Sequence, residues 1–289
     1  MSKKKPIQIV DLFAGPGGLG EGFSSLDDQF QILVSAEMEE SAHKTLTLRA
    51  YFRILKRENP KLLSDYYSYC NGNTESPFSP TTEKYWQQAN IEAQQLTLGT
   101  EEDNKKMDDI IQKGLDLTAN WVLIGGPPCQ AYSLVGRARN RGTEGYTAEN
   151  DHRHFLYKEY LRIIAEYRPT VFVMENVKGI LSSKVSGKRI FHDILNDLSA
   201  PQLAIGLDES DESEDRYVIC SLTSGNAFRH EEDPAKFDAR EFIIRAEDHG
   251  IPQARHRVIL LGIKQSVYKG VSSLQKEEVV TLSDSISTL

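Results

Sequence analysis

The stretch Ile124-Gly-Gly-Pro-Pro-Cys-Gln-Ala-Tyr-Ser133 decides how the rest of the chain is interpreted. It continues the apolar run Trp121–Ile124, which is too short and too β-branched for a helix and predicts a buried strand. Two glycines and two prolines end that strand and stiffen the turn after it. Cys129 is therefore expected on a rigid loop at the carboxyl end of a strand, where open α/β sheets bind their ligands. Taken alone, such a cysteine is more often a small packed residue of the turn.

The composition fits one large α/β domain, with or without insertions. The chain has 289 residues, 39% of them hydrophobic, and its apolar runs all fall short of the roughly 18 residues that a membrane span needs. Its three cysteines lie far apart, which gives neither a metal-binding spacing nor a disulfide framework. These features predict a cytoplasmic protein without a membrane segment or a metal.

The net charge of −8 is concentrated in one place. Residues 208–215 hold six acidic side chains, and without them the balance would be −2. We expect an acidic, solvated loop over residues 206–216, and the charge neither supports nor excludes DNA as the substrate.

A glycine loop follows the first predicted strand. The strand Ile7–Phe13 runs into Ala14-Gly-Pro-Gly-Gly18 and then into a helix, the order that opens a nucleotide-binding unit. The loop is neither the dinucleotide fingerprint nor a P-loop. A second strand, Gln31–Ala36, ends at Glu37, which is placed to accept hydrogen bonds from ribose hydroxyls or to cap the following helix.

Strands and helices alternate along the rest of the chain. Residues 57–98 have the character of an insertion, and helices are expected over 83–98, 101–117, 154–167 and 189–198. Further strands are expected at 169–174, 217–222 and 258–262. This alternation predicts an α/β fold with a doubly wound, mostly parallel sheet. The basic, glycine-rich stretch that contains Arg137, Arg139 and Arg141 is either a lid that meets phosphates or a solvated loop.

Four motifs, in this order, resemble those of the DNA cytosine-5 methyltransferase family. They are Asp11-Leu-Phe-Ala-Gly-Pro-Gly-Gly18, Gly126-Pro-Pro-Cys-Gln130, Glu175-Asn-Val177 and Gln253-Ala-Arg-His-Arg257. The resemblance covers about residues 7–264. It implies a Rossmann-like, S-adenosylmethionine-dependent methyltransferase fold.

The resemblance also implies where the cofactor, S-adenosyl-L-methionine, would bind. Glu37 would hold the ribose, and Met38 occupies a position at which the family often has an aromatic residue against the adenine. An acidic residue near the adenine is not evident, although Asp108 and Asp109 have about the right spacing to Cys129. The remaining residues implied at the cofactor are Phe13, Gly15, Gly17, Gly18, Pro128 and Leu156.

The chemistry of cytosine explains why these residue types are needed. C5 of cytosine is a poor nucleophile, so a thiolate, that of Cys129, is expected to add to C6. Glu175 would protonate N3, which requires a raised pKa, Arg257 would bind O2, and Arg255 would orient the carboxylate. A base inside a duplex must be flipped out, and the loop from Ser133 to Arg141 is expected to close over it. Gln130, Ser133, Arg137 and Asn176 are the predicted residues of the substrate loop and pocket.

The sequence leaves three classes of function open. We expect a DNA methyltransferase of a bacterial restriction-modification system, with double-stranded DNA as its partner. A tRNA methyltransferase and a non-catalytic cofactor-binding module are the alternatives, and a nicotinamide oxidoreductase lacks its glycine fingerprint. Family members normally continue into a target-recognition domain, which is expected to be missing after residue 289. A shortened piece, one subunit of a split enzyme with a complementary subunit, or a degenerate protein would fit.

Overall fold

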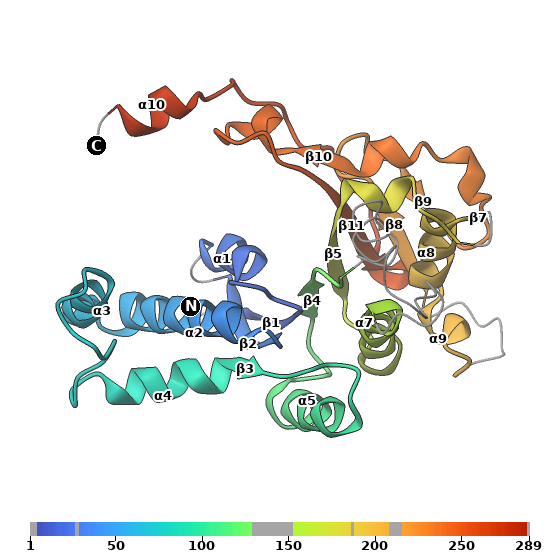
Figure 1. Cartoon of the computed structure of the whole chain (residues 1–289). Helices are drawn as coiled ribbons and strands as arrows, with labels where there is room; N and C mark the ends of the chain where they lie inside the picture. Colours follow the sequence, from blue (N-terminus) through green and yellow to red (C-terminus); the bar gives the residue numbers. More distant parts are fainter. Residues whose placement is uncertain (1–4, 27–28, 129–152, 186–187, 208–215, 288–289) are drawn as a thin grey trace, which may run out of the picture. The chain divides into compact units, whose positions relative to one another are not determined.

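The structure, a computed structural model, describes residues 5–26, 29–128, 153–185, 188–207 and 216–287. The chain forms two compact units, Met1–Gly125 and Gly126–Leu289, which we call unit 1 and unit 2. Figure 1 shows the elements of both units, coloured along the sequence from blue at the N-terminus to red at the C-terminus.

Unit 1 is built around a parallel sheet. Strand β1 (Ile7–Leu12) lies between β2 (Phe30–Glu37) and β4 (Trp121–Gly125), and β2 also pairs with β3 (Ala93–Gln95). All these pairs are parallel. Strand β4 is buried along its whole length, as expected for a parallel strand covered on both faces. The helices of this unit are α1 (Gly18–Ser24), α2 (Glu40–Glu58), α3 (Leu63–Cys70), α4 (Glu83–Glu92) and α5 (Glu101–Gly114), with a short 3-10 helix, η1 (Pro60–Leu62).

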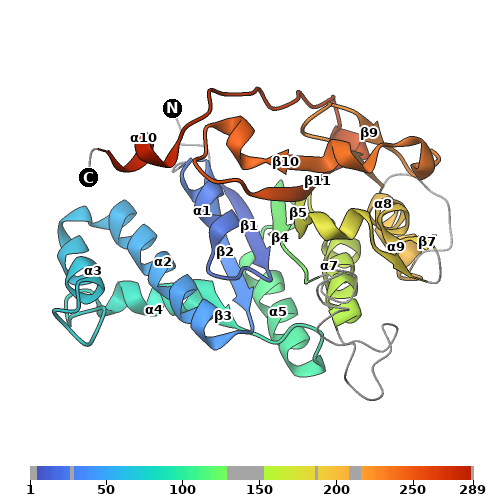
Figure 2. The same ribbon diagram turned by 45° about the horizontal axis from the view of Figure 1, so that its top comes forward.

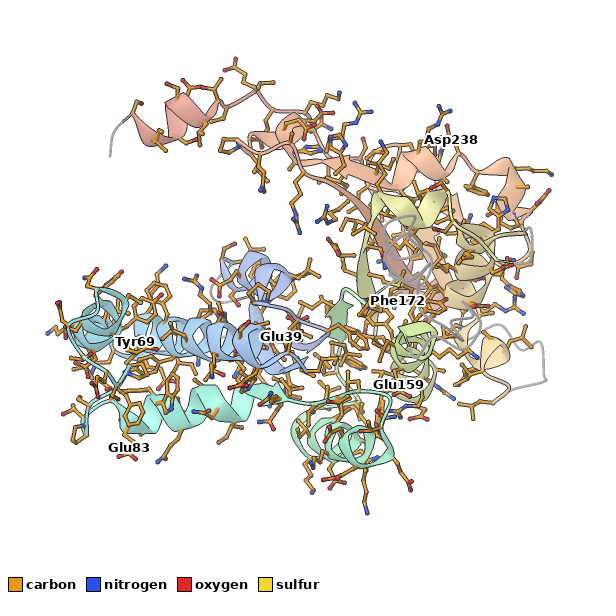
Figure 3. The ribbon with its side chains drawn as sticks, in the orientation of Figure 1. Glu39, Tyr69, Glu83, Glu159, Phe172 and Asp238 are labelled. Carbon is orange, nitrogen blue, oxygen red and sulfur yellow. The ribbon has the colours of Figure 1, made fainter. Side chains whose placement is uncertain are left out.

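Helices α3 and α4 form a helical arm together with α2. Figure 3 shows that Glu83 begins α4 at the end of α2 remote from Glu39, so α4 runs back beside α2. Aromatic side chains fill the space between these helices, among them Tyr51, whose ring meets that of Trp86 edge-on at 5.4 Å. The arm therefore has a small core of its own.

One predicted helix is too long. A helix was expected over residues 83–98, but α4 ends at Glu92 and the next three residues form β3. The backbone of β3 pairs with the last residues of β2, from Ser35 to Glu37. This long-range pairing overrides the local helical preference of the segment.

Unit 2 contains an antiparallel arrangement. Strand β11 (His256–Lys264) lies between β5 (Val171–Val177) and β8 (Tyr217–Cys220), antiparallel to both. Strands β10 (Ile243–Arg245) and β9 (Ala227–Phe228) pair with β11 and β8 respectively. The other elements of the unit are α7 (Arg153–Tyr167), α8 (Ile190–Ser199), α9 (Pro201–Ala204), α10 (Leu282–Ile286), the hairpin β6 (Lys184–Val185) and β7 (Lys188–Arg189), and the 3-10 helices η3 (Lys178–Leu181), η5 (Pro234–Lys236), η6 (Ala239–Phe242), η7 (Ala246–His249) and η8 (Gln265–Val267). Figure 2 gives a second view of these elements.

The predicted Rossmann-like α/β fold is confirmed. The alternation of helices and strands located most of its elements, but not the direction of β11. A parallel connection needs a crossover of a dozen or more residues, usually a helix. The described segment between β8 and β11 holds only short strands and 3-10 turns, which lead the chain back in the antiparallel direction. Within the described residues, no helix is both long and apolar enough to cross a membrane.

The pairing of β5 with β11 depends on a glycine. Phe172, labelled in Figure 3, lies directly opposite Gly262 in the strand register. The Phe172 ring occupies the space that a Cβ atom on Gly262 would need. Any larger residue at position 262 would therefore push the two strands apart.

Replacing Gly262 by alanine is expected to lower the free energy of unfolding by about 1–3 kcal/mol, because the new methyl group overlaps the Phe172 ring. Gly22→Ala is the matched control, since Gly22 lies exposed on α1 with nothing within 4 Å of its Cβ position. The control is expected to be neutral or stabilising by up to about 1 kcal/mol. Urea unfolding followed by circular dichroism compares the two, and equal stabilities would contradict the close packing described here.

Candidate active site

The glycine loop of unit 1 adopts a backbone that few residues tolerate. Phe13 has a φ of 56°, Gly15 of 57° and Gly17 of 94°, all in the left-handed region. For Phe13 such a conformation costs about 1–3 kcal/mol, which the surrounding structure must offset. The loop is closed by a hydrogen bond from the Gly17 N–H to the Ala14 carbonyl oxygen at 3.0 Å. The strained turn keeps the backbone between β1 and α1 in one shape.

Glu37 fixes the loop from the neighbouring strand. Its Oε2 accepts from the Gly15 N–H at 2.8 Å, and its Oε1 accepts from the Glu39 N–H at 2.8 Å. Each carboxylate oxygen has a second lone pair, so the group can still accept a bond from a ligand hydroxyl. Met38, the next residue, is 52% exposed. The predicted cofactor residues of unit 1 thus lie together at the carboxyl ends of β1 and β2, namely Phe13, Gly15, Gly17, Gly18, Glu37 and Met38.

The loop has room for a ligand on its outer side. A Cβ atom on Gly15 or Gly18 would meet nothing within 4 Å, whereas one on Gly17 would lie 2.9 Å from Leu46 Cδ1. Gly17 is thus required by close packing and by its positive φ, while Gly15 and Gly18 border open space. Open backbone with an acidic acceptor beside it fits an adenosyl group, whose ribose presents hydroxyl donors.

The family resemblance implies an acidic residue near the adenine, usually just after the third strand. The structure does not have an acidic residue at the end of its third strand, β3. Asp108 and Asp109 both lie on α5. The residue that ends β3 is Gln95, whose side-chain Nε2 donates to the Met38 carbonyl oxygen at 3.4 Å. Gln95 was missed because β3 is only three residues long and carries the composition of a helix.

Asp11, the first residue of the glycine-loop motif, is fully buried in β1. Both its carboxyl oxygens lack a hydrogen-bond partner among the described residues. A Cβ atom on Gly20 of α1 would stand 3.3 Å from Oδ2, so the carboxyl group lies against that helix. Burial raises the pKa of Asp11 to about 8, although the charge of Arg53 partly opposes this. The carboxyl group is therefore held neutral beneath the loop.

The side chains around α1 form an ionic network. Glu21 of α1 pairs with Arg49 and Arg53 of α2, and Arg53 also pairs with Glu92 of α4. The Arg53 and Glu92 side chains are only 13% and 14% exposed, so solvent screens this pair weakly. The network fixes α1, and with it the glycine loop, against two other helices of unit 1.

In unit 2, the end of β5 and the start of β11 bring three predicted catalytic residues together, namely Glu175, Arg255 and Arg257. Arg257 Nε lies 2.7 Å from Glu175 Oε1, and Arg255 Nη2 lies 4.0 Å from the same oxygen. The strand register explains the contact. Arg257 is opposite Val177, so Glu175 is its diagonal neighbour on the same face of the sheet. The guanidinium group of Arg257 is thus the closer partner of the carboxylate, with Arg255 outside it.

The loop that leads to Cys129 is held beside Glu175. A Cβ atom on Gly126 would lie 3.3 Å from Glu175 Oε2, the oxygen that does not pair with Arg257. Asn176, which is 4% exposed, donates from Nδ2 to the Pro127 carbonyl oxygen at 3.0 Å. Asn176 thus fixes the Pro-Pro turn. Gly126, which has no Cβ atom, leaves space beside Glu175 Oε2.

Several predicted residues lie elsewhere. Pro128 follows this turn, and Leu156 is buried on α7 at 5% exposure. Four predicted residues lie outside the described residues, namely Cys129, Gln130, Ser133 and Arg137. The acidic loop, over its residues 208–215, lies outside them too.

The two described cysteines differ from the proposed nucleophile. Cys220 is fully buried in β8, and this burial raises the pKa of its thiol to about 11, so it remains an unreactive packing residue. Cys70 is exposed at the end of α3, far along the sequence from the Pro-Pro-Cys motif. In the described part of the chain, no three His, Cys, Asp or Glu side chains gather in a way that could hold a metal ion.

Comparisons with known proteins connect the chain to one family. The model of the C-5 cytosine-specific DNA methylase family matches residues 67–201, which include Cys129 and Glu175. The Type II methyltransferase M.Bpa9945I of Bacillus paralicheniformis is 33% identical over 274 residues, 90% of this chain and 54% of that protein. Residues 67–201 thus match the C-5 cytosine-specific DNA methylase family, and the chain as a whole is similar to Type II methyltransferases. A second relative, M.DdeI of Desulfomicrobium norvegicum, is 26% identical over 98% of this chain and 48% of its own length.

The chain spans about half the length of these curated relatives. Solved structures support the methyltransferase fold. The Entamoeba histolytica methyltransferase EhMeth has a TM-score of 0.50 at 18% identity, covering 95% of this chain and 58% of its own. A prophage-encoded E. coli protein, named as a DNA modification methyltransferase, has a TM-score of 0.52 at 20% identity, covering 97% and 54%. At these identities the likeness concerns the fold alone.

The buried carboxyl group of Asp11 makes stability depend on pH. From its ordinary pKa of 3.8 up to about 8, the folded protein keeps a proton on Asp11 that the unfolded chain releases. The unfolded state then binds fewer protons, so this group makes the free energy of unfolding fall as the pH rises through that window.

Asp11→Asn is expected to remove this part of the pH dependence, leaving a flatter profile than that of the parent protein. Urea unfolding at several pH values between 3.8 and about 8 measures the slope. A profile as steep as that of the parent would show that Asp11 is ionised in the folded state.

Proposed function

We propose that this chain is the catalytic part of a DNA cytosine-5 methyltransferase that uses a covalent Cys129–C6 intermediate. The observation that carries the proposal is the Glu175–Arg257 ion pair, in which the other carboxylate oxygen, Oε2, lies beside Gly126 on the loop that leads into Cys129. A carboxylate oriented by guanidinium groups, next to the segment with a nucleophilic thiol, suits a planar base that needs attack on one carbon and proton transfer at a nearby nitrogen.

The cofactor of the proposed reaction is S-adenosyl-L-methionine, which supplies an electrophilic methyl group when bound. The glycine loop from Phe13 to Gly18 would hold its methionine end, and Glu37 would accept hydrogen bonds from the ribose. Met38 would contact the adenine with its exposed side chain. Gln95, at the end of β3, would offer an amide near the adenine in place of the acid that the family resemblance leads one to expect.

The proposed chemistry uses the residues of unit 2 in order. The Cys129 thiolate adds to C6 of cytosine, and the electron pair of the broken C5–C6 π bond makes C5 nucleophilic. Glu175 holds a proton at N3 as charge accumulates on the ring. Arg257, whose Nε is engaged with Glu175 and whose Nη1 donates to the His256 carbonyl oxygen at 2.9 Å, would use Nη2 at the base O2. Loss of the C5 proton and of the thiolate restores the aromatic ring.

The proposed substrate is double-stranded DNA in a bacterial restriction-modification system, located in the cytoplasm. The relatives M.Bpa9945I and M.DdeI are named Type II methyltransferases, which supports this assignment. The target cytosine must leave the duplex to reach the thiol. The stretch from Ser133 through Arg141 is the proposed lid, with Gln130 supporting the pocket. We assign target recognition to a further domain or complementary subunit, since the relatives are about twice as long as this chain.

Replacing Cys129 is expected to abolish methyl transfer without weakening the binding of the cofactor. Cys129→Ser should lower methyl transfer to DNA by at least about a thousandfold, because it replaces the nucleophile. The affinity for S-adenosylhomocysteine should stay within about twofold, since the thiol does not hold the cofactor. Cys70→Ser is the matched control, because Cys70 is exposed on α3 and is expected to leave both quantities unchanged.

Calorimetric titration with S-adenosylhomocysteine, with NADH as the comparison ligand, measures the binding. Transfer of a labelled methyl group to duplex DNA and to tRNA measures the activity and distinguishes the two substrates. Binding of NADH alone would contradict the cofactor assignment. Methyl transfer by Cys129→Ser at the rate of the parent protein would contradict the covalent mechanism, and transfer to tRNA alone would replace DNA as the substrate.

A further inference from the structure

Arg255 directly precedes strand β11, and His256 and Arg257 are the first two residues of the strand. Side chains alternate along a strand, so Arg255 and Arg257 share one face and His256 takes the other. The contacts agree with this pattern. Both arginines lie by Glu175, at 4.0 and 2.7 Å, whereas His256 Nε2 lies 2.6 Å from Glu247 Oε1. The pair of Glu247 with His256 has no part in the chemistry proposed above.

Glu247 belongs to η7, the turn that joins β10 to β11. A backbone hydrogen bond joins η7 to the residue before β11, since the Ala246 N–H donates to the Arg255 carbonyl oxygen at 3.0 Å. Residue Arg245 of β10 lies opposite His256 in the strand register. The turn ends at Gly250, whose φ of 72° is left-handed. The start of β11 is therefore bonded to η7 by main chain and by side chain.

A later segment of the chain holds the other side of this turn. The Glu277 N–H donates to the Asp248 carbonyl oxygen at 3.0 Å, and His249 Nδ1 is 2.9 Å from the Gln275 carbonyl oxygen. Figure 2 shows this C-terminal segment running along the same side of unit 2 as β10. These two hydrogen bonds hold η7 in place, and with it the Glu247 side chain that contacts the His256 ring.

The carboxylate of Glu247 contacts the His256 ring through one of its two oxygens. Its Oε1 meets His256, while its Oε2 is buried and has no hydrogen-bond partner among the described residues. Its own backbone N–H, and then the His256 ring, hold the pKa of Glu247 below the ordinary value. The carboxylate is thus anionic at neutral pH, and its bond to His256 is charge-assisted.

We propose that Glu247 is a positioning residue that acts through His256 to hold the guanidinium groups of Arg255 and Arg257 on Glu175. Anchoring the His256 side chain on one face fixes the strand rotation that sends both arginines to the other face. The His256 carbonyl oxygen also accepts from Arg257 Nη1 at 2.9 Å, so the same residue fixes the arginine side chain directly. The importance of this arrangement for methyl transfer rests on the proposed function, but the arrangement itself does not.

The test compares Glu247→Ala and Glu247→Gln with Asp248→Asn in the full chain. Asp248 is the matched control, because it is the adjacent acid of the same turn and its carboxylate pairs with the exposed Lys276 at 3.1 Å, not with His256. The first readout is the Nε–Hε nuclear magnetic resonance signal of Arg257, assigned by its loss in Arg257→Lys. In the parent protein, the charge-assisted pairing with Glu175 is expected to shift this signal away from that of an unpaired arginine.

Glu247→Ala is expected to move the Arg257 signal toward the unpaired position. Glu247→Gln, whose amide oxygen can still accept from the imidazole N–H, should rescue most of the shift, and Asp248→Asn should leave it unchanged. An unmoved Arg257 signal in Glu247→Ala, together with altered ring signals of His256, would overturn the proposal. Should Glu247→Ala fail to fold, His256→Phe removes the same pair from the other partner and is expected to give the same shift.

The second readout is methyl transfer. Glu247→Ala is expected to lower kcat by about tenfold, as removal of an orienting partner commonly does, with KM for the cofactor within about twofold. A merely structural role would lower the amount of folded protein without this split. If the parent chain transfers no methyl group, the proposed function fails in this chain, while the Arg257 signal still decides whether Glu247 positions the arginines. An equal fall of kcat in Asp248→Asn would overturn the specific role of Glu247.

Discussion

The register between β5 and β11 is the constraint on which the candidate catalytic site depends. It sets Arg257 opposite Val177 and so makes Glu175 the diagonal neighbour of Arg257 on one face. A slip of one residue would turn every side chain of β11 to the other face and separate the ion pair. The close packing of Phe172 on Gly262 lies in the same ladder and allows little freedom for such a slip. Strand packing and site geometry are therefore one property of unit 2.

In unit 1, the main constraint is the fixed backbone conformation of the glycine loop between β1 and α1. Glu37 reaches from β2 to the Gly15 N–H, and the left-handed turn at Phe13 leaves the loop in a strained conformation. Asp11 beneath the loop is neutral and buried, so the strand carries no charge into the core. The free lone pairs of Glu37 remain at the loop edge, where a ribose would need acceptors. Loop, acid and strain together form the preformed site that we propose for the adenosyl group of the cofactor.

The sequence predicted well where strands end in loops, but it predicted poorly which strands and side chains lie next to one another. Glycines, prolines and short apolar runs located β1, β4 and the loops after them, because these signals are local. The approach of Arg257 to Glu175 depended on family resemblance, since pairing of residues 82 positions apart has no periodic signature. The direction of β11 and the short strand β3 with Gln95 were not predicted, because both depend on long-range strand pairing, which propensity does not encode. The Glu247–His256 pair was not predicted either, because it forms across the turn between β10 and β11, whose antiparallel pairing was not foreseen.

The most direct test of the covalent mechanism is to trap its intermediate. In DNA that carries 5-fluorocytosine at the target, the methylated adduct has no C5 proton to lose, so the bond from Cys129 Sγ to C6 persists. With S-adenosylmethionine present, mass spectrometry is expected to find the DNA strand attached to the peptide that contains Cys129. Methyl transfer to ordinary cytosine without any adduct at Cys129 would contradict the account, as would an adduct at Cys70 or Cys220.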